Sequence, residues 1–121
     1  MKSIPHVISW NLTKACNLLC THCYLPTNSF QQFNPTNHSI IKSGQPQFTT
    51  QDTKDELDTN NALKVIDEIA ELNPNIILIL TGGEPLLRRD LFDLSRYASR
   101  KGMMVLLGTN ACLINDDVAR K

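Results

Sequence analysis

The chain has 121 residues, the size of one small domain, of which 41% are hydrophobic and 20% charged. This composition is typical of a globular protein that buries a modest core, and it requires no second domain. Twelve basic and twelve acidic residues cancel, so the charge balance indicates no binding face for nucleic acid or an anionic membrane, and we predict neither as a partner.

The N-terminus lacks the long apolar stretch of a secretory signal. The most apolar run, residues 76–80, is far shorter than a segment that spans a bilayer. We therefore expect a cytoplasmic protein, in which thiols stay reduced and clustered cysteines indicate a metal site or catalysis instead of disulfides.

The first half of the chain predicts a strand, a long loop and a helix. Residues 7–12 are rich in β-branched and apolar side chains, which predicts a strand that runs into a group of cysteines. Residues 26–58 shift to Asn, Gln, Thr, Ser and Pro, which predicts an inserted polar loop. A helix follows and ends at residues 73–74. One face of this helix is apolar at helical spacing, through Ala62, Ile66, Ile69 and Ala70.

The second half continues the alternation of strands and helices. Residues 76–80 form a continuous aliphatic run, which favours a strand covered on both faces, as in a parallel sheet. A second helix is predicted from Asp90, as its N-cap, to Lys101, with Gly102 ending it. Residues 103–107 then predict a third strand. Strands that alternate with helices imply right-handed crossovers and a parallel sheet.

Three of the four cysteines lie within eight residues at the spacing C-x3-C-x2-C: Cys16, Cys20 and Cys23. Three thiolates on one short loop can hold three corners of a cubane iron–sulfur cluster, which normally takes four cysteines. With no fourth cysteine nearby, one iron keeps an open coordination position, which is the usual mark of a catalytic metal site. The spacing is also compatible with a structural zinc site whose fourth ligand is His22 or His38.

A glycine-rich turn follows the second predicted strand: Gly82, Gly83, Glu84 and Pro85. Glycine lets a backbone approach a ligand closely and adopt conformations closed to other residues. The carboxylate of Glu84 can offset the charge of an ammonium group. In parallel α/β folds, ligands gather at this end of the strands. Taken alone, a pair of glycines favours a plain turn between a strand and a loop.

The two motifs together resemble the radical SAM superfamily, because the cysteines follow a first strand and the glycine-rich turn follows a second. Residues 10–13, 86–87 and 108–110 look like the family too. The resemblance implies an α/β fold, the N-terminal part of a partial, TIM-like (β/α)6 barrel with about three βα units and parallel strands. Such a barrel needs well over 121 residues. We therefore expect residues 1–121 to be an N-terminal fragment of the core domain that is inactive alone.

The resemblance also implies a role for each residue of the two motifs. The ligands of a [4Fe–4S] cluster would be Cys16, Cys20 and Cys23. S-adenosyl-L-methionine would chelate the fourth iron through its amino and carboxylate groups. The residues that line the site of this cofactor would be Gly82, Gly83 and Glu84.

In the family, the reduced cluster cleaves S-adenosylmethionine, and the resulting 5′-deoxyadenosyl radical abstracts hydrogen from a small-molecule or peptide substrate. The low potential of such a cluster implies an electron donor such as ferredoxin or flavodoxin. The flanking residues most resemble SPASM-related enzymes that tailor tetrapyrroles in haem d1 and alternative haem biosynthesis. Peptide-modifying maturases share much of the pattern. A non-catalytic iron–sulfur or electron-transfer module is a further alternative.

Two features depart from the family pattern. The family often has glycine after Thr-Asn, where this chain has Ala111 followed by Cys112. We expect Cys112 to be packed at the end of the third strand and not to be a ligand. The polar loop at 26–58 is longer than the usual link between the cysteines and the first helix, and loops of such length are commonly functional or disordered.

Overall fold

The computed structural model describes residues 6–18, 20, 23–24, 55–73 and 75–121. The polar loop expected at about 26–58 lies outside these residues as far as position 54. The described elements, in chain order, are β1 (His6–Thr13), α1 (Thr59–Leu72), β2 (Ile76–Gly82), the short 3-10 helix η2 (Pro85–Leu87), α2 (Leu91–Arg100), β3 (Met104–Leu107) and α3 (Asp116–Ala119).

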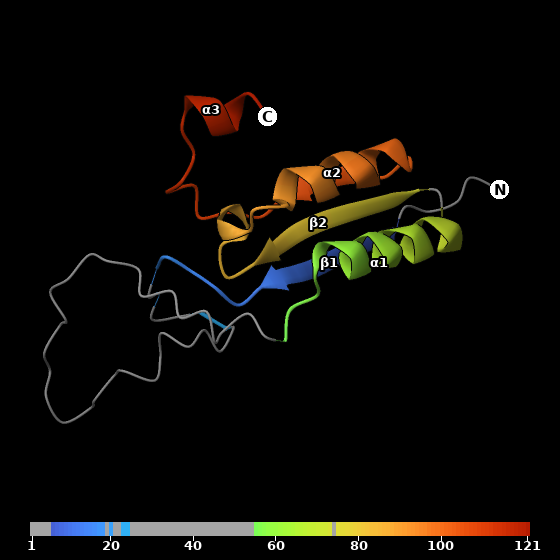
Figure 1. Ribbon diagram of the computed structural model, residues 1–121, viewed down its shortest axis with the longest axis horizontal. Coiled ribbons are helices and arrows are strands. Elements are labelled where there is room, and N and C mark those ends of the chain that lie inside the picture. Colours follow the sequence, from blue (N-terminus) through green and yellow to red (C-terminus); the bar gives the residue numbers. More distant parts are fainter. Residues whose placement is uncertain (1–5, 19, 21–22, 25–54, 74) are drawn as a thin grey trace, which may run out of the picture.

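The three strands form one parallel sheet in the order β1-β2-β3. Ile8 of β1 lies opposite Leu78 of β2, which lies opposite Val105 of β3. Each connection passes through a helix, and α1 and α2 run side by side along the sheet (Figure 1). Right-handed crossovers that advance in one direction place both helices on the same face. The predicted α/β fold with parallel strands is confirmed.

The hydrophobic core lies between the sheet and these two helices. Its completely buried members are Ala62, Ile66, Leu78, Leu80, Leu91, Leu94 and Ala98. The predicted apolar face of α1 is confirmed, because Ile69 and Ala70 pack against this core as well. α1 begins with a side-chain cap, in which Asp58 accepts a hydrogen bond from the backbone N–H of Asn61.

α2 shows a difference between the predicted and the observed cap. Asp90 occupies the N-cap position, but its side chain makes no capping hydrogen bond. Its carboxylate instead accepts hydrogen bonds from the guanidinium of Arg88 and the hydroxyl of Thr59. The predicted N-cap position is confirmed, and the carboxylate engages Arg88 because a charge-assisted, two-pronged hydrogen bond is stronger than one from a backbone N–H.

The second face of the sheet has no described helix on it. Val7 and Met104 are each 61% exposed on this face, and Leu106 is 46% exposed. Residues along β2 alternate between buried and half-buried. The sequence predicts that both faces of β2 are covered, but only the face toward the helices is buried. A further layer or further strands would be needed to bury the other face.

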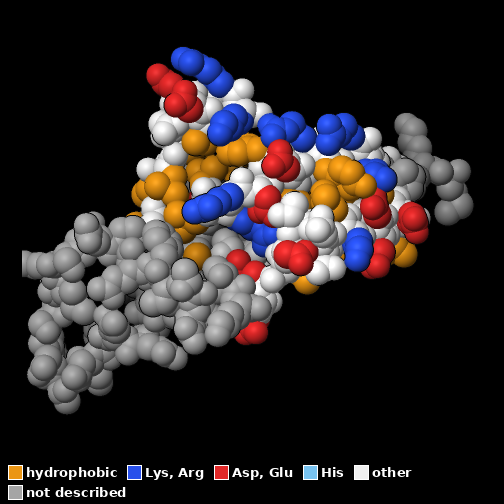
Figure 2. All heavy atoms as spheres, in the orientation of Figure 1, with side chains coloured by type: hydrophobic (Ala, Val, Ile, Leu, Met, Phe, Trp, Pro, Cys, Tyr) orange, Lys and Arg blue, Asp and Glu red, His pale blue; other side chains and the backbone are white. Residues whose placement is uncertain are grey.

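The outer surfaces of α1 and α2 carry charged side chains of both signs (Figure 2), in agreement with the neutral composition. The two helices also share a polar contact, in which the hydroxyl of Tyr97 donates to Asp67 at 2.9 Å and Lys101 forms an ion pair with Asp67 at 2.7 Å. The hydrogen bonds from Lys101 and Tyr97 lower the pKa of Asp67. In the part of the chain that the structure describes, no helix is long and apolar enough to cross a membrane.

Candidate functional site

Three segments meet at one edge of the sheet, because parallel strands bring their carboxyl ends together. β1 runs into the cysteine segment, residues 16–23. β2 runs into the glycine-rich turn, and β3 runs into residues 108–110. The motifs that are separate in the sequence therefore follow strands that end at the same side of the sheet.

The glycine-rich turn packs directly on the backbone that leads to the cysteines. The N–H of Gly83 donates to the carbonyl of Thr13 at 2.8 Å. The N–H of Glu84 donates to the carbonyl of Ala15 at 2.7 Å. A Cβ on Gly83 would lie 2.2 Å from the Ala15 oxygen. Gly82 has a φ of +139°, and a Cβ there would lie 2.4 Å from the Thr13 oxygen. Only glycine permits this contact.

The sequence suggests that the two glycines allow a ligand to approach, whereas the close approach in the structure is to the chain's own backbone. This contact places the turn beside the residue that precedes Cys16. The predicted role of Gly82, Gly83 and Glu84 in lining a cofactor site stays a prediction.

Glu84 is completely buried and connects the turn to the end of β3. Its Oε1 accepts hydrogen bonds from the backbone N–H of Leu86 at 2.9 Å and from the hydroxyl of Thr109 at 2.8 Å. Its Oε2 accepts one from the backbone N–H of Asn110 at 2.8 Å. Three donors satisfy the carboxylate inside the protein, so the side chain is directed toward β3 and away from solvent.

Asn110 extends this connection to the cysteine segment. Its Nδ2 donates to Oδ1 of Asn17 at 2.8 Å, and Asn17 directly follows Cys16. Its own Oδ1 accepts a hydrogen bond from the backbone N–H of Cys112 at 3.0 Å, which determines the orientation of the amide. Residues 108–110 resemble the family, but the sequence alone indicates no role for them. A bond across 93 positions leaves no periodic signal in the sequence.

Glu56 holds the same segment from the residues that precede α1. One oxygen of its carboxylate accepts hydrogen bonds from the hydroxyl of Thr13 at 2.7 Å and from the backbone N–H of Lys14 at 2.8 Å. Thr13 is only 5% exposed, so this contact lies at the margin of the core. The sequence contains no signal for it, because Glu56 belongs to no periodic element.

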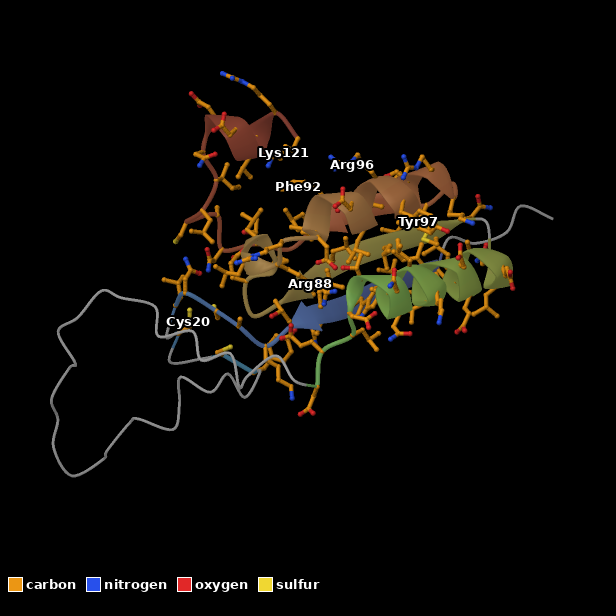
Figure 3. The ribbon with its side chains drawn as sticks, viewed as in Figure 1. Cys20, Arg88, Phe92, Arg96, Tyr97 and Lys121 are labelled. Atoms are coloured by element: carbon orange, nitrogen blue, oxygen red, sulfur yellow. The ribbon has the colours of Figure 1, made fainter. Side chains whose placement is uncertain are left out.

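Arg88 lies between the start of α1 and the start of α2, next to the end of β1 (Figure 3). Its guanidinium donates to the carbonyls of Leu12 at 3.0 Å and Leu57 at 2.8 Å. It also forms an ion pair with Asp90 at 2.7 Å, and the two side chains are only 10% and 16% exposed. Burial by itself raises the pKa of Asp90, but the hydrogen bonds from Arg88 and Thr59 outweigh this effect and lower it.

The three clustered cysteines are free thiols. Cys16 and Cys23 are partly buried. Cys20, which Figure 3 labels, is exposed. The backbone N–H of Cys23 donates to the carbonyl of Cys20 at 3.2 Å. Among the described residues, no three His, Cys, Asp or Glu side chains are grouped so as to hold a metal ion. His22 and His38, the alternative zinc ligands, lie outside those residues. The donor set itself, three thiols on one segment, fits an iron–sulfur cluster.

The turn beyond β3 contains a residue in the left-handed region. Ala111 has a φ of 66°, which glycine adopts more readily than alanine. The position where the chain departs from the family pattern is thus one that favours glycine. Cys112, expected to be packed, is exposed, because β3 ends at Leu107 and Cys112 lies in the turn beyond it.

Replacing the exposed Ala111 by glycine should stabilise the chain by about 1 kcal/mol, because it removes the steric penalty of the left-handed conformation. Urea denaturation followed by circular dichroism measures this change. Ala119→Gly, at an exposed position in α3, is the matched control and should destabilise by about 0.5–1 kcal/mol. A lower stability for Ala111→Gly would contradict the prediction.

Comparison with known proteins identifies the family. The model of the family described as "Radical SAM superfamily" matches residues 10–121. The chain belongs to the radical SAM superfamily. This result confirms the resemblance carried by the two motifs, and the three parallel strands with their helices agree with the fold that the resemblance implies.

Relatives of this radical SAM chain have names from two classes. It is 36% identical over all of its length to the AdoMet-dependent heme synthase of Methanosarcina barkeri, of which it covers 28%. It is 34% identical, over 86% of the chain, to the pre-heme d1 synthase of Dinoroseobacter shibae, of which the match covers 20%. It is 31% identical, over 97% of the chain, to the mycofactocin maturase MftC of Mycobacterium ulcerans, of which the match covers 26%. The chain thus spans about a quarter of the length of these relatives. No solved structure matches it.

Proposed function

We propose that this chain binds a [4Fe–4S] cluster through Cys16, Cys20 and Cys23, and S-adenosyl-L-methionine at the turn formed by Gly82, Gly83 and Glu84. The observation that carries the proposal is the pair of backbone hydrogen bonds from Gly83 and Glu84 to the segment before Cys16. They bring a cysteine segment and a glycine-rich turn to the same edge of a parallel sheet, which is where α/β proteins bind ligands.

When bound, the cluster and S-adenosylmethionine supply a 5′-deoxyadenosyl radical, by the chemistry that defines the superfamily. The chain's own residues provide the binding site and hold its parts in position. The three thiols provide ligands and leave one iron for the cofactor. The buried hydrogen bonds of Glu84 hold the glycine-rich turn to the end of β3.

The substrate class that we propose for the whole enzyme is a tetrapyrrole, whose side chain would be modified in haem or haem d1 formation. The names of the two haem-related relatives support it. A peptide substrate is the second candidate, because the identity to the mycofactocin maturase extends over 97% of the chain. A ferredoxin or flavodoxin-type protein would supply the electron.

Anaerobic reconstitution with iron and sulfide tests the cluster. We expect the chain to bind four irons and to give the electron paramagnetic resonance spectrum of a reduced cubane, which changes when S-adenosylmethionine is added. Replacing Cys16, Cys20 or Cys23 by serine should lower the iron content to background in each case, because each removal leaves only two thiolates.

Cys112→Ser is the matched control, because Cys112 is an exposed cysteine outside the cluster of three. This variant should bind iron as the wild-type chain does. Three results would contradict the proposal: one bound zinc per chain and no cluster, loss of iron in Cys112→Ser, or a spectrum that S-adenosylmethionine leaves unchanged. The last result would favour an electron-transfer module.

A further inference from the structure

Three hydrogen bonds connect the segments that meet at the candidate site, and a fourth, from Leu86 to Glu84, lies within the turn and the short helix after it. Leu86 and Thr109 donate to Oε1 of Glu84, and the backbone N–H of Asn110 donates to Oε2. The side chain of Asn110 then donates to Asn17. We call these four residues, Glu84, Thr109, Asn110 and Asn17, the polar bridge. It joins the glycine-rich turn, the end of β3 and the cysteine segment.

We infer that Asn110 is a positioning residue that holds the cysteine segment against the glycine-rich turn through Asn17. The inference rests on the proposed function, because it concerns the residue next to the proposed cluster ligand Cys16. It gives a role to the end of β3, which neither of the two motifs includes.

The geometry supports a directional role for Asn110. Both ends of its amide are engaged, since Oδ1 accepts from the backbone N–H of Cys112 at 3.0 Å and Nδ2 donates to Asn17 at 2.8 Å. Its backbone N–H is bound to a buried carboxylate at 2.8 Å. A side chain fixed at both ends transmits the position of β3 to its partner, because neither group can turn without breaking a hydrogen bond.

The hydrogen bonds of Glu84 indicate a structural role for its carboxylate and not direct contact with an ammonium group. Its side chain is completely buried, and its two oxygens already accept three hydrogen bonds from the protein. The carboxylate therefore holds the turn to the end of β3. Glu84 and Asn110 thus belong to the same hydrogen-bonded connection between the glycine-rich turn and the end of β3.

The test uses the rate at which iodoacetamide modifies Cys16 in the cluster-free chain, measured by mass spectrometry. Cys16 is partly buried in the wild-type chain. Asn17→Ala should increase its rate about fivefold, the effect of losing one hydrogen bond, and Asn110→Ala should increase it at least as much, because it also removes the acceptor for the N–H of Cys112. The double variant should increase the rate no further than Asn110→Ala alone, because each single variant already removes the hydrogen bond between the two side chains.

Two further variants separate positioning from general loss of structure. Asn17→Asp keeps an acceptor for Nδ2 of Asn110, so Cys16 should react no faster than in the wild-type chain. Asn115→Ala removes the cap of α3, where Asn115 accepts from the backbone N–H of Val118, and should leave the rate at Cys16 unchanged. Wild-type rates in Asn110→Ala, or additive effects in the double variant, would overturn the inference.

Reconstituted samples provide a second readout that distinguishes this inference from the proposed function. If the wild-type chain forms the cluster, Asn110→Ala should alter its electron paramagnetic resonance spectrum, and Asn115→Ala should not. A wild-type chain that forms no cluster would contradict the proposed function but leave the effect on Cys16 modification intact. A cluster whose spectrum is identical in Asn110→Ala and the wild-type chain would contradict the positioning role.

Discussion

Replacing Gly83 by alanine should destabilise the chain by more than about 3 kcal/mol and separate the glycine-rich turn from the cysteine segment. The added Cβ would lie 2.2 Å from the oxygen of Ala15 and 2.7 Å from its carbonyl carbon. Both are backbone atoms, which cannot rotate away as a side chain does. Urea denaturation measures the loss of stability, and iron content after anaerobic reconstitution measures the loss of the site.

Gly102→Ala is the matched control for this prediction. Gly102 has a φ of +94°, but a Cβ there would meet nothing within 4 Å. The control should lose about 1–2 kcal/mol from backbone strain alone and bind iron as the wild-type chain does. If Gly83→Ala were as stable as Gly102→Ala and bound the same amount of iron, the contact between turn and cysteine segment would not be essential.

Replacing Arg88 by methionine should destabilise the chain by about 3 kcal/mol at neutral pH. The substitution keeps most of the apolar length of the side chain but removes the partner of Asp90, whose side chain is 16% exposed. It also leaves the carbonyls of Leu12 and Leu57 without the donor that now binds them. Urea denaturation again provides the measurement.

An exposed ion pair on α2 provides the control for Arg88. Arg96 pairs with Asp93 at 2.7 Å, but the two side chains are 53% and 70% exposed. Water and salt screen such a pair, so Arg96→Met should change the stability by less than about 0.5 kcal/mol. Equal losses of stability in Arg88→Met and Arg96→Met would show that the burial of Arg88 and its hydrogen bonds to two backbone carbonyls do not stabilise the chain.

The pH dependence of the Arg88→Met effect has a defined sign. The pKa of Asp90 in the folded chain is lowered below its value of about 3.9 in the unfolded chain. The stability that this carboxylate contributes is therefore complete above about pH 4 and is lost as the pH falls through the folded pKa. The difference between wild type and Arg88→Met should shrink between pH 7 and pH 3, whereas the small difference for Arg96→Met should stay small.

Local patterns in the sequence were sufficient for the elements and their order. The aliphatic run at 76–80 predicted β2, and the apolar face of residues 62–70 predicted α1, because side-chain periodicity follows directly from strand and helix geometry. The same patterns do not specify which partner a polar side chain takes. Asp90 has the right residue type for a cap, but Arg88 takes its carboxylate.

In the candidate site, too, the sequence reveals short motifs but not contacts between distant residues. The cysteine spacing and the glycine pair were visible in the sequence because each motif is short and continuous. Glu56, Arg88 and Asn110 were not found, because their partners lie 31 to 93 positions away. No periodicity connects residues at such distances, and only the parallel sheet brings them together.

The sequence by itself determined the α/β order of the elements, because side-chain periodicity carries that information, and it contained the two motifs that resemble the radical SAM superfamily. The tertiary structure decided what the turn contacts and where its glutamate points. The two glycines pack against the backbone at Thr13 and Ala15, and Glu84 binds the end of β3. The physical reason is that hydrogen-bond partners are chosen by proximity in space, which the order of residues does not specify.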